Sequence, residues 1–292
     1  MKDAKWIEAN IPRLAGKTVA ITGSTGGLGR ALARLLLSRG ASLLLLDRDG
    51  VRSSAHRDSL LALYPTATVT CCTLDLSSPA SVLACGKALA DSRLDILIHN
   101  AGAYHLPREK GSYGYDRVFE IDAIAPYLLT RALLPALLRA ERPCVTLVGS
   151  IACRLARIDP ADPDYTARSA VRAYGNAKRC ISAALPRLLA DTPVRVAIAH
   201  PGISPTGIIS SYPRALRAVA APAMKLLFPA PARACLSVAL AATAPPPPDR
   251  WIGPRILGVW GKPRLAKLKL PPEECARAQA ILEESIKSYI CV

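Results

Sequence analysis

The stretch KTVAITGSTGGLG, from Lys17 to Gly29, decides the fold of this chain. It begins with a short apolar run, which is typical of a buried strand, and ends in a turn with glycines at Gly23, Gly27 and Gly29. The residues that follow, LGRALARLLLSRG, have the apolar spacing of a helix that stops at Gly40. Glycine permits a tight turn and a helix N-terminus attracts anions, so this strand-turn-helix predicts a site for a nucleotide phosphate.

The same alternation of strand and helix continues along the chain. Further strands are predicted at 42–47, 68–74, 95–100, 143–149, 194–200 and 254–259, and helices at about 52–63, 79–90, 115–140, 172–190, 230–243 and from 272. Alternating elements of this kind predict an α/β fold with a doubly wound parallel sheet of seven strands, of the Rossmann type.

The domain organisation follows from length and regularity. The chain has 292 residues and no linker that would divide it, so a single nucleotide-binding domain over 1–292 is expected. After Pro201 and Gly202 the regular spacing gives way to a segment rich in Ser, Pro, Ala and Arg. We expect a substrate lid over about 203–230, inserted after the sixth strand, and a helical tail over about 272–292. The apolar and basic residues of the lid suit a lipophilic substrate or an interfacial helix, or they pack on the domain.

The charge of the chain is uneven. Its net charge is +16, and between residues 203 and 270 ten Lys or Arg stand against Asp249 alone. Such a segment could attract an anionic substrate, a membrane surface or a nucleic acid, or it could be a solvated basic face. Because the segment lacks the kind of aromatic interleaving that suits stacking on bases, we expect no nucleic-acid partner, and peripheral membrane contact is the less favoured interpretation.

Targeting and metal signals are missing from the sequence. No apolar run approaches the roughly 18 residues of a membrane span, and MKDAKWIEANIP lacks the apolar centre of a signal peptide, so a cytoplasmic protein is expected. The nine cysteines include no C-x-x-C pair, so no metal site is predicted.

Four further motifs follow the glycine turn in order along the chain. They are His99-Asn100-Ala101-Gly102 after the fourth strand, Ser150 after the fifth, Tyr174 with Lys178 on the next helix, and Pro201-Gly202 with Thr206 after the sixth. In this order, over about residues 15 to 260, the chain resembles the short-chain dehydrogenase/reductase family. The 24 residues from Ser150 to Tyr174 resemble the retinol-dehydrogenase-like branch of that family, in which an inserted loop separates the two.

The spacing of Tyr174 and Lys178 suits alcohol and ketone chemistry. Oxidation of an alcohol needs a base that takes its proton, but a free tyrosine, with a pKa of about 10, is protonated at neutral pH. Residues four apart on a helix share one face, so Lys178 lies where its charge would lower the pKa of Tyr174. Tyr165 has Ser169 at the same spacing and is therefore not expected to be catalytic.

The resemblance implies roles for the other residues of the site. Tyr174 would be the acid/base, Lys178 would also hold the nicotinamide ribose, and Ser150 would hydrogen-bond the substrate oxygen. Asp122 stands where the family usually has Asn; it could retain that residue's role through its main-chain carbonyl, or pair with Lys178 and alter the pKa of Tyr174. His99, in place of the first Asn of N-N-A-G, is expected to be a hydrogen-bonded core residue.

The end of the second strand bears on the choice of cofactor. A carboxylate there can bind both adenosine ribose hydroxyls and repel a 2′-phosphate, so Asp47 favours NAD over NADP, although Arg48 could turn toward a phosphate. By resemblance Asp75 and Leu76 would contact the adenine and Thr206 the nicotinamide carboxamide. The full set of predicted cofactor-binding residues is Gly23, Ser24, Thr25, Gly27, Leu28, Gly29, Asp47, Arg48, Asp75, Leu76, Asn100, Ala101, Gly102, Tyr174, Lys178, Pro201, Gly202 and Thr206.

Two functions are carried forward from the sequence. The first is an NAD(P)-dependent oxidoreductase that moves hydride between the cofactor and a secondary alcohol or ketone, lipophilic in character. The alternative is a catalytically weakened nucleotide-binding sensor or interaction protein on the same fold, which Asp122 and His99 encourage. The resemblance also implies a homo-oligomer, a dimer or a tetramer.

Overall fold

The apolar run Thr18–Thr22 forms strand β1, in the middle of an eight-stranded sheet. The computed structural model describes residues 2–104, 106–202, 230–247 and 249–290. Strand β1 pairs in parallel with β2 (Ser42–Asp47) on one side and with β4 (Ile96–His99) on the other. Its side chains alternate between two core clusters, one on each face of the sheet. Because both faces are covered, the strand is apolar throughout.

The sheet has the doubly wound order that the sequence predicted. Its order is β3-β2-β1-β4-β5-β6-β7-β8, and every neighbouring pair is parallel except β7 and β8. The remaining strands are β3 (Val69–Thr73), β5 (Cys144–Val148), β6 (Arg195–Ala199), β7 (Arg250–Ile256) and β8 (Trp260–Lys267). The chain reverses its direction of winding between β1 and β4, and ligands of such sheets bind beyond the carboxyl ends of the strands at this point.

The seven-strand prediction was wrong by one strand. The last strand was expected at 254–259, but β7 ends at Ile256, a turn with positive φ at Leu257 and Gly258 follows, and β8 returns antiparallel to β7. Strand β8 has the sequence WGKPRLAK and most of its residues are exposed, so it lacks the apolar run by which buried strands are detected.

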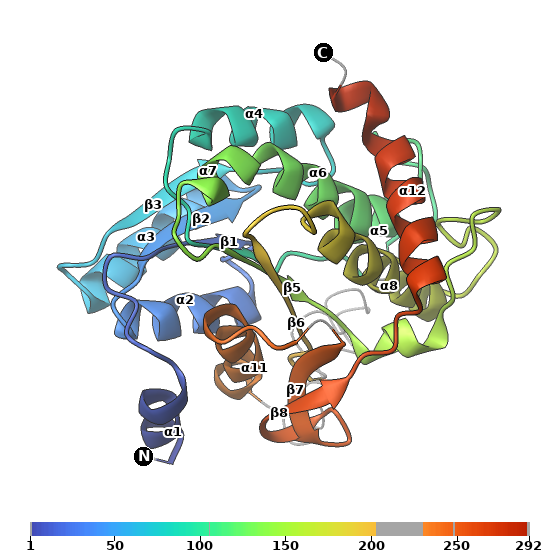
Figure 1. Ribbon diagram of the computed structural model, residues 1–292. Coiled ribbons are helices and arrows are strands. Elements are labelled where there is room, and N and C mark those ends of the chain that lie inside the picture. Colours follow the sequence, from blue (N-terminus) through green and yellow to red (C-terminus); the bar gives the residue numbers. More distant parts are fainter. Residues whose placement is uncertain (1, 105, 203–229, 248, 291–292) are drawn as a thin grey trace, which may run out of the picture.

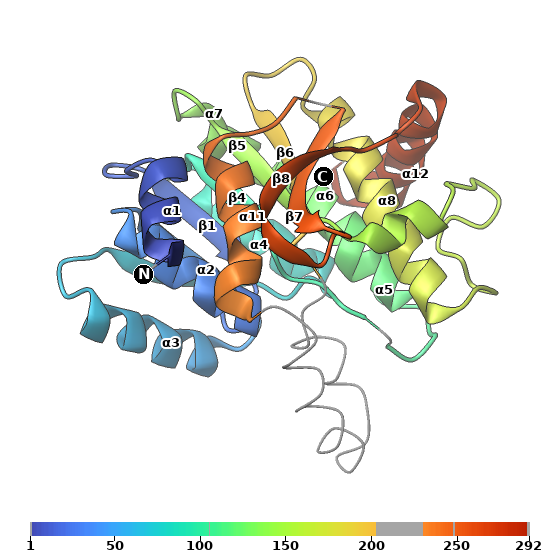
Figure 2. The ribbon, with the colours of Figure 1, turned by 90° about the horizontal axis from the view of Figure 1, so that it is seen from below.

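Helices form a layer on each face of the sheet (Figures 1 and 2). One face carries α4 (Pro79–Leu89), α6 (Ala125–Ala132), α8 (Ala170–Leu188) and α12 (Pro272–Ile290), and the other carries α2 (Gly27–Ser38), α3 (Gly50–Leu63) and α11 (Pro231–Thr243). A short helix, α1 (Lys2–Asn10), precedes β1. The helical tail predicted from residue 272 is therefore present as α12, which packs beside α8 (Figure 1).

The helix predicted over 115–140 is interrupted around Asp122. It comprises α5 (Arg117–Phe119), a π-helical turn η1 (Glu120–Ile124), α6 and α7 (Leu134–Leu138). Pro126 has no N–H to donate to the carbonyl of Asp122 four residues before it, and the N–H of Ala125 bonds the carbonyl of Glu120, five residues before it. This widened turn carries Asp122.

The predicted lid falls outside the described residues. Residues 203–229, with Thr206 among them, are not described, so both the lid and the role of Thr206 stay predictions. Among the described residues, no helix has both the length and the apolar character needed to cross a membrane.

Candidate active site

The glycine turn between β1 and α2 is shaped by backbone contacts that only glycine allows. Gly23 has a φ of +67°, and a Cβ on Gly29 would lie 2.4 Å from the carbonyl oxygen of Gly23. Gly26, which sequence reasoning did not select, is the N-cap of α2 and offers no side-chain hydrogen bond to the first turn of that helix. The first N–H groups of α2 thus have no side-chain cap, as a phosphate-binding helix end requires.

Asn100 and Thr22 join the end of β4 to this turn. The Asn100 side-chain amide donates to the carbonyls of Thr22 at 2.9 Å and Gly23 at 3.0 Å. The hydroxyl of Thr22 accepts from the backbone N–H groups of Asn100, at 3.0 Å, and Ala101, at 2.9 Å. Thr22 was not among the site residues selected from the sequence. These bonds hold the glycine turn in place, so the Asn100-Ala101-Gly102 segment helps to fix the shape of the predicted phosphate site.

Asp47 is buried, and its carboxylate accepts four hydrogen bonds from the protein itself. Its carboxylate accepts from the hydroxyl of Ser24 at 2.5 Å, the hydroxyl of Ser53 at 2.9 Å, and the N–H and hydroxyl of Thr25 at 3.1 and 3.2 Å. Arg48, the next residue, is exposed at the carboxyl end of β2. Asp47 therefore fixes the glycine turn, and the side chain presented to the outside at this position is a cation.

A cavity of about 1430 Å³ runs along the carboxyl edge of the sheet, from the end of β2 to the β7–β8 hairpin. The predicted site residues that line it are Gly23, Thr25, Leu28, Asp47, Arg48, Asp75, Leu76, Asn100, Ala101, Gly102, Ser150, Tyr174, Lys178, Pro201 and Gly202. The predicted residues Ser24, Gly27, Gly29 and Asp122 are not in its wall, and Ser24 and Asp122 are buried behind it. The structure thus brings most of the predicted residues to one place, although 150 residues separate some of them in the chain.

Tyr174 and Ser150 face this cavity from two packed segments. Tyr174 lies in the second turn of α8, and Ser150 is the N-cap of the short 3₁₀ turn η2 (Ile151–Leu155), where its hydroxyl accepts from the N–H of Ala152 at 3.2 Å. Gly175 permits the close approach, because a Cβ at that position would lie 2.3 Å from the carbonyl oxygen of Ala152. The distance between the two hydroxyl-bearing segments is therefore set by backbone packing.

Lys178, in the cavity wall, forms an ion pair with Asp122, which is buried behind that wall. Its ammonium lies 2.7 Å from Oδ1 of Asp122, and both side chains are nearly inaccessible, at 7% and 0% exposure. The other carboxylate oxygen accepts from the N–H of Ala103 at 3.0 Å. Gly102 leaves room for the pair, because a Cβ there would lie 2.5 Å from Oδ1 of Asp122. Of the two roles considered for Asp122, the structure shows the ion pair.

The pKa values in this group follow from burial and from the pair. Burial raises the pKa of Tyr174, the charge of Lys178 lowers it, Asp122 opposes Lys178, and the net direction is upward. For Lys178 the attraction of Asp122 and Tyr174 outweighs burial, so its pKa is raised above the usual range. Lys178 acts on Tyr174 in the expected direction, but with Asp122 beside it the phenol stays protonated at neutral pH.

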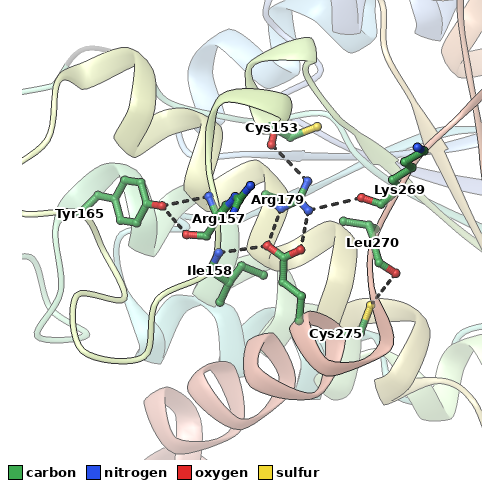
Figure 3. A network of polar contacts seen from close by, with 9 residues as sticks. Cys153, Arg157, Ile158, Tyr165, Arg179, Lys269, Leu270 and Cys275 are labelled. Carbon is green, nitrogen blue, oxygen red and sulfur yellow. Dashed lines mark hydrogen bonds and ion pairs between the residues drawn. The ribbon is translucent and has the colours of Figure 1, made fainter.

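His99 and Tyr165 do not belong to the site. His99 is a buried core residue whose Nε2 lies 2.7 Å from the hydroxyl of Thr130, and burial lowers its pKa to about 3. The hydroxyl of Tyr165 bonds the backbone of Arg157 and is not in the cavity wall (Figure 3). His99 is therefore the hydrogen-bonded core residue that its position predicted.

A second ion pair, mostly removed from solvent, ties α8, the helix that carries Tyr174, to the C-terminal helix α12 (Figure 3). Arg179 of α8 donates through Nε to Glu274 of α12 at 2.6 Å and through Nη2 to the other carboxylate oxygen. The same guanidinium donates to the carbonyls of Cys153 in η2 and Lys269, at 3.4 and 3.3 Å. Glu274 also accepts from the N–H of Ile158 at 3.0 Å. Sequence reasoning missed this network, since its partners are up to 116 residues apart.

Comparison with known proteins places this arrangement in a family. The sheet, the glycine turn and the Tyr-Lys-Ser group define a Rossmann-type nucleotide-binding protein. A model of the short chain dehydrogenase family matches residues 17–215, and the chain belongs to this family.

The relatives of the chain include retinol dehydrogenases. Bovine "dehydrogenase/reductase SDR family member 13" is 35% identical over 197 residues, which are 65% of this chain and 52% of that protein. Mouse "retinol dehydrogenase 14" is 33% identical over 210 residues, covering 66% of this chain and 63% of that protein. The chain thus spans roughly half to two thirds of the length of these relatives.

Solved structures share the fold over most of the chain. An uncharacterised protein of Mycobacterium paratuberculosis is 27% identical, with a TM-score of 0.77 and 96% of both chains covered. Pseudomonas aeruginosa RhlG, solved as an NADP complex, is 25% identical, with a TM-score of 0.59, 79% of this chain and 90% of that chain covered.

Proposed function

We propose that this protein is an NAD(P)-dependent oxidoreductase that transfers hydride between a nicotinamide cofactor and a secondary alcohol or ketone. The observation that carries the proposal is the meeting of Tyr174, Lys178 and Ser150 at one cavity that also reaches the glycine turn. The uncapped start of α2 and the backbone contacts of Gly23 and Gly29 fit a dinucleotide pyrophosphate. When bound, the cofactor supplies or accepts the hydride.

The residues of the chain handle the proton and the substrate oxygen. Tyr174, protonated at neutral pH, donates its proton to the oxygen of a ketone as hydride arrives, and takes it back in the reverse direction. Ser150 hydrogen-bonds the same oxygen and stabilises charge that develops on it. Lys178, held by Asp122, favours the phenolate that Tyr174 becomes.

The geometry around Asp47 bears on the choice between NAD and NADP. The four internal hydrogen bonds of Asp47 argue against NAD, since they already occupy the carboxylate that would bind the ribose hydroxyls. Arg48 and Arg52, both exposed, line the cavity at the same end. Guanidinium groups bind phosphate, so we assign the 2′-phosphate of NADP to this end, and the NADP complex of RhlG is in keeping with that choice.

Substitution of Arg48 tests this assignment. Arg48→Gln should raise the Kd for NADPH by about tenfold, the effect of one lost charged hydrogen bond, and leave the Kd for NADH unchanged. Quenching of intrinsic fluorescence by each nucleotide measures both constants. Arg57→Gln is the control, because Arg57 lies on α3, pairs with Asp58 and is not in the cavity wall. Wild-type protein that binds NADH more tightly than NADPH would overturn the assignment.

Substitution of the phenol tests the enzyme itself. Absorbance of the reduced nicotinamide would be followed with a panel of ketones, secondary alcohols, sterols and retinoids. Tyr174→Phe should lower kcat by about 10²- to 10⁴-fold while cofactor binding is retained. Tyr64→Phe, which removes a hydroxyl at the end of α3 that bonds the carbonyl of Arg34, is the matched control and should have wild-type turnover. Equal turnover by the Tyr174→Phe variant would refute the proposed role.

The sensor alternative has one structural observation in its favour. Asp122 neutralises Lys178 in the protein, whereas the asparagine usual in the family would leave the ammonium unopposed. A sensor would bind NADPH and show no oxidation of it with any member of the panel, even in a single turnover at high enzyme concentration. The predictions of a homo-oligomer, of one domain over the whole chain and of a cytoplasmic location stay predictions.

A further inference from the structure

One end of the cavity is lined by cations that have few partners. At the β7–β8 hairpin the wall contains Arg154, Arg250, Arg255, Arg264 and Lys267. Within the described part of the chain, Arg250 alone of these five has an ion-pair partner, Asp249 at 3.4 Å. The sequence of 203–229 contains no Asp or Glu, so that segment cannot supply the missing carboxylates either. This end of the cavity therefore has an excess of positive charge that the chain does not neutralise locally.

Two of these cations lie on the same side of the hairpin. The guanidinium carbon of Arg154 is 5.4 Å from the centre of the Trp251 ring, and this stacking holds its side chain against β7. Arg264 of β8 pairs with Gly253 of β7, two residues after Trp251, and paired residues of a ladder project from the same face. Gly253 has no side chain that would cover Arg264. Arg154 and Arg264 are thus presented from one face of the hairpin.

Apolar side chains line the same cavity as Ser150, Tyr174 and these arginines. Arg154 follows Ser150 by four residues in the 3₁₀ turn η2, and at about 2 Å of rise per residue the two backbones are about 8 Å apart. Leu155, Val171 and Leu257 line the cavity wall, and their exposed fractions of 60%, 41% and 81% show that they present apolar surface there. Val171 lies three residues before Tyr174 on α8, hence on the same helix face.

We propose that the substrate is an amphipathic anion, in which an apolar chain joins the reacting carbonyl or hydroxyl group to a carboxylate or phosphate held by Arg154 and Arg264. The inference rests on the proposed function for the position of the reacting group. The binding of the anion, however, depends on Arg154 and Arg264 and not on the identity of the reacting group. The guanidinium groups form charge-assisted hydrogen bonds with oxyanions, and the apolar wall excludes water from the chain between the two ends.

Binding of non-reacting probes tests the anion site independently of catalysis. Decanoate, decyl phosphate and decan-1-ol have the same chain and differ in the head group. By calorimetry on protein saturated with NADP, both anions should bind at least about tenfold more tightly than the alcohol, and R154Q/R264Q should abolish this difference. Lys262→Gln, an exposed residue of β8 that is not in the cavity wall, is the control and should behave as wild type. Equal affinity of the wild type for all three probes would overturn the proposal.

A matched pair of ketones tests the link to catalysis. The keto acid 9-oxodecanoate should be reduced with a kcat/KM about tenfold or more above that of its methyl ester, and the ratio should fall toward one in R154Q/R264Q. Tight decanoate binding without reduction of either ketone would refute the proposed reduction but support the anion site. Sedimentation with vesicles of anionic or zwitterionic lipid supplies the remaining control. Arginine-dependent binding to anionic vesicles, with no preference for decanoate over decan-1-ol, would show a membrane surface and overturn the proposal.

Discussion

The ion pair of Arg179 and Glu274 offers the sharpest test of how the site is held together. Its side chains are 11% and 6% exposed, so both charges have lost most of their contact with water and depend on each other. Glu274→Gln removes the negative charge and leaves a carbonyl oxygen that can still accept from Ile158. The Gln oxygen can also accept from Nε of Arg179, which shares Oε1 with Ile158 in the wild type, but Nη2 of the guanidinium would lose its carboxylate acceptor and face the amide group, with only the carbonyl of Lys269 left to it, at 3.3 Å. Breaking a buried pair in this way costs about 3–5 kcal/mol in free energy of unfolding.

This cost converts to a measurable melting shift. For a chain of this size about 2 °C of Tm is lost per kcal/mol, so Glu274→Gln should melt roughly 6–10 °C below wild type by circular dichroism at neutral pH. Glu284→Gln on the same helix is the matched control, because Glu284 is 71% exposed and its Lys287 partner is 3.4 Å away. That variant should stay within about 1 °C of wild type. A double-mutant cycle with Arg179→Gln should show coupling of at least about 1 kcal/mol.

The same pair predicts how stability depends on pH. Arg179 and the N–H of Ile158 outweigh burial and hold the pKa of Glu274 below its ordinary value of 4.5. A carboxyl whose pKa is lower in the folded state stabilises the protein above pH 4.5, and this stabilisation is lost as the pH falls below 4.5 through the folded-state pKa. The difference in Tm between wild type and Glu274→Gln should therefore be largest near neutral pH and shrink below pH 4.5. An equal Tm for the two proteins at pH 7, or a gap that widens in acid, would refute the reasoning.

Two further predictions concern the catalytic group. Gly175→Ala places a Cβ 2.3 Å from the carbonyl oxygen of Ala152 and should push Ser150 away from Tyr174, which lowers kcat by about 10²-fold with little change in cofactor affinity. Gly50→Ala, whose nearest neighbour would be 3.8 Å away, is the control, and wild-type kinetics for Gly175→Ala would show that η2 tolerates the shift. Asp122→Ala leaves Lys178 buried without its partner and Ala103 without its acceptor, so it should lose about 3–5 kcal/mol of unfolding free energy. Asp122→Asn, which keeps one acceptor oxygen, should lose less, and urea denaturation that ranks the two variants in the opposite order would contradict this account.

Most of the residues that the structure brings together at the candidate site could be predicted because their signals are local. The glycines at 23 and 29 could be recognised in the sequence because a tight turn and a close backbone contact exclude any side chain. The short distance from a Cβ on Gly29 to the carbonyl oxygen of Gly23 shows this directly. Tyr174 and Lys178 are readable because four residues make one helical turn. The interruption of the helix around Asp122 could not be predicted, since Pro126 replaces a regular turn by a wider one without changing the apolar spacing.

What the sequence by itself determined is the order of strands and helices, apart from α1 and β8, and the identity of the groups at the carboxyl ends of the strands. Apolar periodicity and glycine turns depend on residues a few positions apart, so a short stretch of sequence is enough to recognise them. What only the tertiary structure decided is which hydrogen-bond or ion-pair partner each charged group has. The carboxylate of Asp47 accepts hydrogen bonds from Ser24, Ser53 and Thr25. Lys178 forms an ion pair with Asp122, 56 residues away in the chain. The physical reason is that burial removes water as a partner, so the fold, by the strands and helices it places side by side, dictates which hydrogen bonds and ion pairs replace it.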